Sequence, residues 1–138
     1  MSKTILASLL ECRRRPTQKP AIRFIRNGRW QNLSWQDYFE LSSQVGAGLD
    51  ELGIKPGDRV AICANTRHEW AVSDMGAMGI GAVTVPIYQS SLASEMEFIL
   101  NNSEAKVLFV ENQALLERWK SVAERTPSVK WVISFEVV

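Results

Sequence analysis

The run Arg59-Val60-Ala61-Ile62-Cys63-Ala64 decides the fold class of this chain. It is short and almost continuously apolar, which is typical of a strand covered on both faces of a sheet. Lys55-Pro56-Gly57-Asp58 precedes it and predicts a turn. We therefore expect a central strand at residues 59–64.

Helical and strand-like segments alternate after this strand. A helix is expected first, with Asn65 or Thr66 as its N-cap, and residues 82–86 are expected to form the next strand. Ser91 and Ser94 are the expected caps of a further helix. The pattern then predicts the end of that helix near residues 101–102, a strand at 106–110, a helix at 113–124 and a strand at 131–135.

A hairpin and a long helix are expected before the central strand. Residues 21–35 alternate apolar and polar side chains around Asn27-Gly28, which favours a two-residue turn because both positions adopt positive φ. Ser34 and Asp37 form a capping-box pattern ahead of apolar residues at helical spacing, which stop at Gly53. The predicted fold class is α/β, a layered and mostly parallel sheet flanked by helices, with a small antiparallel hairpin near the N-terminus.

We predict two parts, an N-terminal helix with its lead-in at residues 1–19 and an incomplete α/β domain at residues 20–138. The first part carries an apolar face followed by arginines. We favour a surface helix packed on its own domain, while contact with an anionic membrane surface stays open as the alternative. The apolar residues are Ile5, Leu6, Leu9 and Leu10, and the arginines are Arg13 to Arg15.

Composition excludes several function classes. Sixteen basic and fifteen acidic residues leave a net charge of +1, so charge gives no case for a nucleic-acid partner. Cys12 and Cys63 form no C-x-x-C pair and His68 is the sole histidine, so neither a zinc site nor a disulfide framework is supported. We therefore expect a protein of the reducing cytoplasm.

No export or membrane-spanning signal is expected. The arginines follow the N-terminal apolar stretch instead of preceding it, unlike a signal peptide. The apolar segment Met75 to Tyr88 is too short to span a membrane.

The glycines of the chain are interpreted as packing positions. Gly76, Gly79 and Gly81 lie between a helix and the strand after it, whereas a nucleotide-binding loop lies between a strand and the helix after it. We expect them to let a helix end pack closely on the sheet, and the same explanation is given for Gly46 and Gly48. His68, although it neighbours Glu69, has no nucleophile near it in sequence and is expected to be a surface or first-turn residue.

One short segment is a candidate site. Tyr88, Gln89, Ser90 and Ser91 follow a predicted parallel strand, at the edge where open α/β sheets bind ligands. We take them as weak candidates for the substrate side, with helix capping by the serines as the alternative. No residue is assigned to catalysis, cofactor binding or metal binding.

Several motifs resemble the AMP-forming acyl and aryl synthetases, the adenylation superfamily. The resemblance begins with Leu33-Ser34-Trp35-x-x-Tyr38 and residues 54–62, and continues through Asn65-x-x-x-Glu69-Trp70, Asp74 and residues 78–88. It covers Pro20 to about Val110. Pro86-Ile87-Tyr88-Gln89-Ser90-Ser91 is similar to long-chain fatty acyl-CoA ligases, because amino-acid-activating members usually carry an aspartate or asparagine where Tyr88 stands.

This resemblance implies an enzyme that activates a fatty acid with ATP and Mg²⁺ and passes the acyl group to coenzyme A. It also implies groups that residues 1–138 lack: a Ser/Thr/Gly-rich phosphate loop ending in lysine, a Tyr-Gly-x-Thr-Glu segment, a ribose-binding aspartate and a late lysine. We therefore expect an N-terminal ligase segment that is inactive alone, binds no cofactor by itself, has the remainder of the ligase as its partner, and exposes apolar faces that favour self-association.

Two alternatives stay open at this point. The chain could be a non-enzymatic, stand-alone α/β interaction module. It could also be a fragment of another adenylating enzyme, such as an acyl-acyl-carrier-protein synthetase or an aryl ligase.

Overall fold

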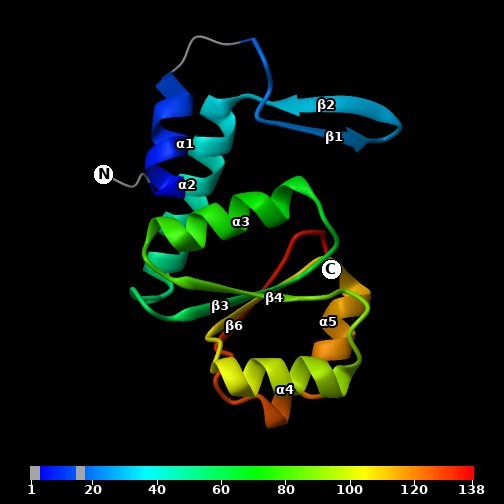
Figure 1. Cartoon of the computed structure of the whole chain (residues 1–138). Coiled ribbons are helices and arrows are strands. Elements are labelled where there is room, and N and C mark those ends of the chain that lie inside the picture. Colours follow the sequence, from blue (N-terminus) through cyan, green and yellow to red (C-terminus); the bar gives the residue numbers. More distant parts are fainter. Residues whose placement is uncertain (1–3, 15–17) are drawn as a thin grey trace.

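The computed structural model describes residues 4–14 and 18–138 and has the predicted α/β architecture (Figure 1). A two-stranded antiparallel hairpin precedes a four-stranded parallel sheet whose strand order is β4-β3-β5-β6. The hairpin strands are β1 (Ile22–Arg26) and β2 (Arg29–Leu33), and the parallel strands are β3 (Arg59–Cys63), β4 (Val83–Ile87), β5 (Val107–Val110) and β6 (Trp131–Ser134).

Helices cover both faces of the parallel sheet (Figure 1). On one face lie α2 and α3, with α1 packed on α2, and on the other lie α4, α5 and the short 3₁₀ helix η1. The bounds are α1 (Ile5–Arg14), α2 (Trp35–Glu51), α3 (His68–Gly79), α4 (Ala93–Ser103), α5 (Gln113–Lys120) and η1 (Ala123–Arg125).

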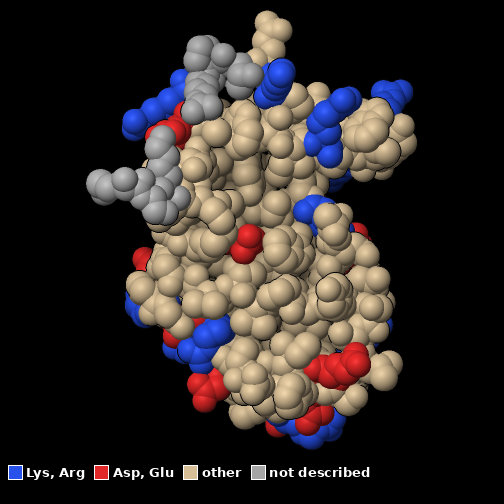
Figure 2. All heavy atoms as spheres, in the orientation of Figure 1, with Lys and Arg blue, Asp and Glu red and all other residues tan. Residues whose placement is uncertain are grey.

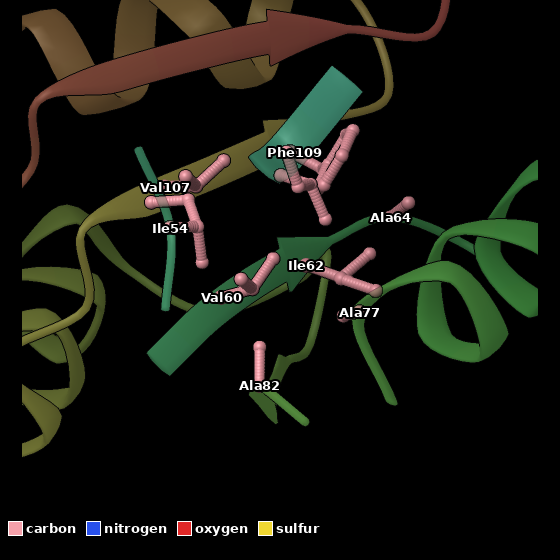
Figure 3. Packing of buried hydrophobic residues seen from close by; sticks show 9 residues of the cluster. Ile54, Val60, Ile62, Ala64, Ala77, Ala82, Val107 and Phe109 are labelled. Atoms are coloured by element: carbon pink, nitrogen blue, oxygen red, sulfur yellow. The ribbon is translucent and has the colours of Figure 1, made fainter. Parts of the chain in front are cut away.

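The central position of β3 follows from its apolar sequence. Val60 and Ile62 point toward α2 and α3, where they join the cluster that Figure 3 shows around Val107. Ala61 and Cys63 alternate onto the opposite face and pack beneath α4 and α5. Full burial of a side chain such as Ile62 stabilises the fold by roughly 1.5–3 kcal/mol, so two apolar faces on one strand fix it inside the sheet.

Local signals place the hairpin and α2 where the sequence predicts them. Asn27 and Gly28 have φ of 52° and 70°, as the two central residues of the predicted turn require. At the start of α2, the Ser34 side chain accepts from the Asp37 N–H at 3.1 Å, and the Asp37 carboxylate accepts from the Ser34 N–H at 3.0 Å. The predicted capping box is therefore confirmed.

The predicted caps of the next two helices are wrong. Neither Asn65 nor Thr66 caps α3, because the helix begins one residue later, after Arg67, while the Asn65 backbone N–H and side-chain amide both donate to Glu111. Neither Ser91 nor Ser94 is the N-cap of α4. That helix begins after Leu92, where the Glu95 carboxylate accepts from the Leu92 N–H at 2.8 Å.

Two further expectations need correction. The helix predicted at 113–124 ends at Lys120, because the chain turns there to bury Val122 and Thr126. Gly76 allows α3 to pack closely on α2, not on the sheet as expected. A Cβ on Gly76 would lie 2.8 Å from the Ser42 carbonyl oxygen of α2. No described atom lies within 4 Å of a Cβ built on Gly48, so packing does not explain that glycine.

The N-terminal helix lies on the domain, as the favoured interpretation expects. Leu9 of α1 is buried, and the Arg13 guanidinium stacks over the Phe39 ring of α2 at 4.2 Å from its centroid. Arg15 lies outside the described residues. Across residues 4–14 and 18–138, no helix combines the length and apolar character needed to cross a bilayer.

Candidate functional site

The carboxyl edge of the parallel sheet contains a switch in strand order. Strand β3 lies between β4 and β5 in the sheet. The chain that leaves β3 runs to the face covered by α3, and the chain that leaves β5 runs to the opposite face, covered by α5. In open α/β sheets, ligands bind in the crevice that such a switch creates. The residues that follow β3 and β5 therefore define the first place to look for a site.

Glu111 lines this crevice with a hydrogen-bonded carboxylate. It follows β5 and accepts from the Asn65 backbone N–H at 2.6 Å and from the Asn65 side-chain amide at 3.3 Å. Its side chain is only 12% exposed. Since Asn65 follows β3, the two contacts join the loops on either side of the switch.

Arg67 extends the same network into α3 and the chain after β6. Its guanidinium holds Glu69 through two hydrogen bonds of 2.7 and 2.9 Å and Glu136 through one of 2.9 Å, and it lies 3.4 Å from Glu111. Hydrogen bonding to Glu69 raises the pKa of Arg67. Burial acts to raise the pKa of Glu69, but the Arg67 hydrogen bonds, a backbone hydrogen bond and the charges of Arg67 and His68 together lower the net pKa. Arg67 thus links the start of α3 to the segments that follow β5 and β6.

The hairpin meets the network through an aromatic contact. The Phe24 and His68 rings stack with centroids 3.9 Å apart and an interplanar angle of 20°. Burial lowers the pKa of His68, so a neutral imidazole is favoured. A cavity of about 1060 Å³ lies between the hairpin and the carboxyl edge, with Trp30 and Arg67 in its lining.

The predicted candidates lie at the same edge of the sheet but outside that cavity. Tyr88 to Ser91 follow β4, as expected, yet β4 is the outer strand and none of the four residues lines the cavity. Tyr88 is 84% exposed, and its carbonyl accepts from the Cys63 thiol at 3.8 Å. Burial raises the pKa of that thiol to about 11.

Arg118 of α5 holds the candidate loop in place. Its guanidinium donates to the Gln89 carbonyl at 2.6 Å and to the Ser91 carbonyl at 2.8 Å. The sequence reasoning missed Arg118, and no local signal marks it. It also missed Arg67 and Glu111, although the residues directly after parallel strands could have been screened as switch-point candidates.

Residues of the family-like motifs have structural roles. The Tyr38 hydroxyl donates to the Ala71 carbonyl at 3.3 Å and ties α2 to α3. Asp58 accepts from the Lys55 N–H at 2.9 Å and pairs with Lys106 at 2.8 Å, so it holds the predicted turn in place. Trp70 packs against the core.

The described residues do not fit a magnesium site. Within that part of the chain, no group of three or more His, Cys, Asp or Glu side chains is placed to hold a metal ion. The Glu111 oxygens are already engaged by Asn65 and Arg67.

The chain is similar in sequence to long-chain fatty acid ligases. Residues 10–137 match the family model described as AMP-binding enzyme. The long-chain-fatty-acid--CoA ligase FadD15 of Mycobacterium tuberculosis is 34% identical over 107 residues, which are 78% of this chain and 18% of that protein. The ligase ACSBG2 of Xenopus laevis is 29% identical over 78% of this chain and 15% of its own length. The chain thus spans less than a fifth of these relatives.

Solved structures of the same class share the fold. An anthranilate CoA ligase, AuaEII, in complex with anthranoyl-AMP superposes with a TM-score of 0.81 and 26% identity, covering 94% of this chain and 24% of that one. A Mycobacterium tuberculosis fatty acyl CoA synthetase gives a TM-score of 0.70 and 28% identity over 75% of this chain and 21% of its own. The sequence match, the α/β architecture and these structural neighbours show that the chain belongs to the AMP-binding enzyme family.

Proposed function

We propose that this chain is the N-terminal part of a long-chain fatty acid–CoA ligase, an enzyme that converts a fatty acid, ATP and CoA to acyl-CoA, AMP and pyrophosphate. The observation that carries the proposal is the similarity to FadD15 over 78% of this chain. In this proposal the enzyme acts in the reducing cytoplasm, which agrees with two free cysteines.

The proposal divides the work between this chain and the rest of the ligase. The carboxyl edge is held together by the Glu111 and Arg67 contacts, which leaves their charges paired with one another. Such a network supports a layer of the fold. ATP, Mg²⁺, CoA and the fatty acid are then bound by the remainder of the ligase, where the characteristic phosphate loop and lysine belong.

An uncharged surface supports docking of that remainder. Figure 2 shows few charged side chains over α3 and beside β4, while basic side chains gather around the hairpin. Val83, Tyr88, Leu92 and Phe98 are 50 to 84% exposed. Burying side chains of this size against another part of the ligase stabilises the assembly by roughly 25 cal/mol per Å² of apolar surface.

Sequence similarity favours a fatty acid over an aromatic acid. The fold itself is shared by the anthranilate ligase AuaEII and by the fatty acyl synthetase, so it does not separate the two substrate classes. The curated relatives of this chain are named long-chain-fatty-acid--CoA ligases. We therefore place the full enzyme in the fatty acid branch.

An activity assay and a dye-binding measurement test this division of labour. The purified 138-residue chain, supplied with palmitate, ATP, Mg²⁺ and CoA, is expected to release no AMP, with FadD15 as the active control. It is also expected to bind a hydrophobic dye and to self-associate as its concentration rises. AMP release by the chain alone, or a monomer that binds no dye at high concentration, would overturn the proposal.

A further inference from the structure

A groove lies where α1, α2 and α3 meet, on the far side of the α2–α3 layer from the sheet. It encloses about 350 Å³, near the lower end of the range of roughly 300–1,000 Å³ for small-molecule sites. Its lining is mainly apolar and includes Leu6, Leu9, Phe39, Met75 and Ile80.

Small residues keep the floor of this groove open. Gly46 and Gly76 let α2 and α3 approach so closely that a Cβ on Gly46 would lie 3.0 Å from the Gly76 carbonyl oxygen. Ala47 and Gly79 continue the lining on either side. The helices therefore touch through their backbones, and the space beside that contact is filled by no large side chain of the described chain.

Two neighbouring serines in the lining differ in their hydrogen bonding. Ser43 donates from its hydroxyl to the Phe39 carbonyl at 2.8 Å. Ser42 is 4% exposed, and within the described residues its buried hydroxyl oxygen has no hydrogen-bond partner. Buried polar groups are normally paired, so an unpaired hydroxyl in a pocket lining is a position that a ligand can satisfy.

We propose that this groove binds a single-chain, uncharged amphiphile, with its alkyl chain between α1 and α3 and its polar group hydrogen-bonded to Ser42. A linear alcohol has the required chemistry, because a hydroxyl can both donate to and accept from Ser42. None of the described residues that line the groove is cationic, and the Arg13 guanidinium beside the groove is stacked on the Phe39 ring. A carboxylate is therefore disfavoured, because burying an unpaired charge is costly. The proposal concerns this chain's own groove and holds whether or not the ligase proposal does.

The N-terminal helix is the part that must yield to such a ligand. The Ser42 hydroxyl oxygen is covered in the structure, so in this proposal a ligand reaches it after a small shift of α1, which has fewer buried side chains than α2 or α3. Of the side chains of α1, only Leu9 is fully buried, while Ile5 and Leu10 are largely exposed. Binding is therefore expected to alter the contacts of α1 and to leave the parallel sheet unchanged.

Isothermal titration of the 138-residue chain with 1-octanol tests the proposal, with octanoate as the charged comparison. Octanol is expected to bind one site, and Ser42→Ala to weaken that binding by about fivefold, the loss of one net hydrogen bond. Ser43→Ala is the matched control and should bind octanol like the unmodified chain, because its hydroxyl is already satisfied. Ala47→Leu should abolish binding by filling the groove.

The outcomes separate the proposal from its alternatives. Equal octanol affinity in the Ser42→Ala and Ser43→Ala variants would overturn the role of the Ser42 hydroxyl. Octanoate binding as tightly as octanol would overturn the selection for an uncharged group. A chain that binds no octanol would overturn the site itself.

Discussion

The backbone N–H of Asn65 donates a 2.6 Å hydrogen bond to the carboxylate of Glu111, and this bond joins the ends of β3 and β5 where the strand order reverses. The switch point of this sheet is thus occupied by the protein's own side chains. Charge-assisted hydrogen bonds of this kind are stronger than neutral ones. The Glu111 carboxylate is largely shielded from water, and the lower local dielectric strengthens the bond further.

Removing that carboxylate should destabilise the chain. Glu111→Ala leaves the Asn65 N–H without its acceptor and should lower the free energy of unfolding by about 1–3 kcal/mol. Glu136→Ala removes an Arg67 partner whose side chain is 50% exposed, and it should cost less than about 1 kcal/mol. Urea unfolding of both variants measures the difference, and equal losses would show that the switch-point bond is not special.

The stability of the chain should depend on pH through His68. Its pKa is lowered by burial in the folded chain from an ordinary value of 6.5, so the unfolded chain binds the proton more readily. Stability is therefore complete above about pH 6.5 and declines as the pH falls from there toward the folded-state pKa. Because His68 is the sole histidine, His68→Phe should flatten the stability profile just below about pH 6.5 while keeping a ring against Phe24.

A pH titration of the unfolding midpoint checks this expectation. An unchanged slope in His68→Phe would assign the pH dependence to the carboxylates instead. A profile that rises as the pH falls would contradict the lowered pKa itself.

The contact between α2 and α3 should tolerate no side chain at Gly76. A Cβ there would lie 2.8 Å from both the Ser42 carbonyl oxygen and the Val45 side chain, so Gly76→Ala should cost about 1–3 kcal/mol. Gly48→Ala is the control within α2, since no described atom lies within 4 Å of its Cβ, and it should stabilise the chain by roughly 0.5–1 kcal/mol. Thermal unfolding that shows the same sign for both variants would contradict this packing.

Arg118 should restrain the loop that carries Tyr88 to Ser91. Arg118→Ala removes the donors to the Gln89 and Ser91 carbonyls, so amide hydrogen exchange at Ser91 should accelerate. Arg125→Ala is a suitable control, because the Arg125 side chain hydrogen-bonds Glu97 of α4 at 2.9 Å instead of the carbonyl groups of that loop. If exchange at Ser91 is the same in both variants, the loop is held by its own turn instead.

Local patterns predicted most of the fold. The hairpin turn at Asn27-Gly28 and the Ser34 cap depend on neighbours within four residues, so the sequence around them contains the necessary information. The central position of β3 follows from apolar side chains that need cover on both faces. These elements could be predicted because their causes are close in sequence.

The unpredicted parts depend on partners that are distant in sequence. Asn65 is a good helix cap by type, but Glu111, 46 residues further on, offers a charged acceptor that local propensity does not reveal. Arg67 meets Glu136 across 69 residues, and Arg118 meets Gln89 across 29. Tyr88 to Ser91 follow β4 as the strand pattern predicts, while the network at the switch point required the three-dimensional structure.

A chimeric ligase tests the central claim most directly. The segment of Mycobacterium tuberculosis FadD15 that this chain matches is replaced by this chain, and palmitate-dependent AMP formation is measured with ATP, Mg²⁺ and CoA, with FadD15 lacking the segment as the inactive control. The account predicts that the chimera forms palmitoyl-CoA and AMP, because this chain supplies a layer of the ligase fold. A folded chimera that binds ATP yet forms no more palmitoyl-CoA than the control would contradict it.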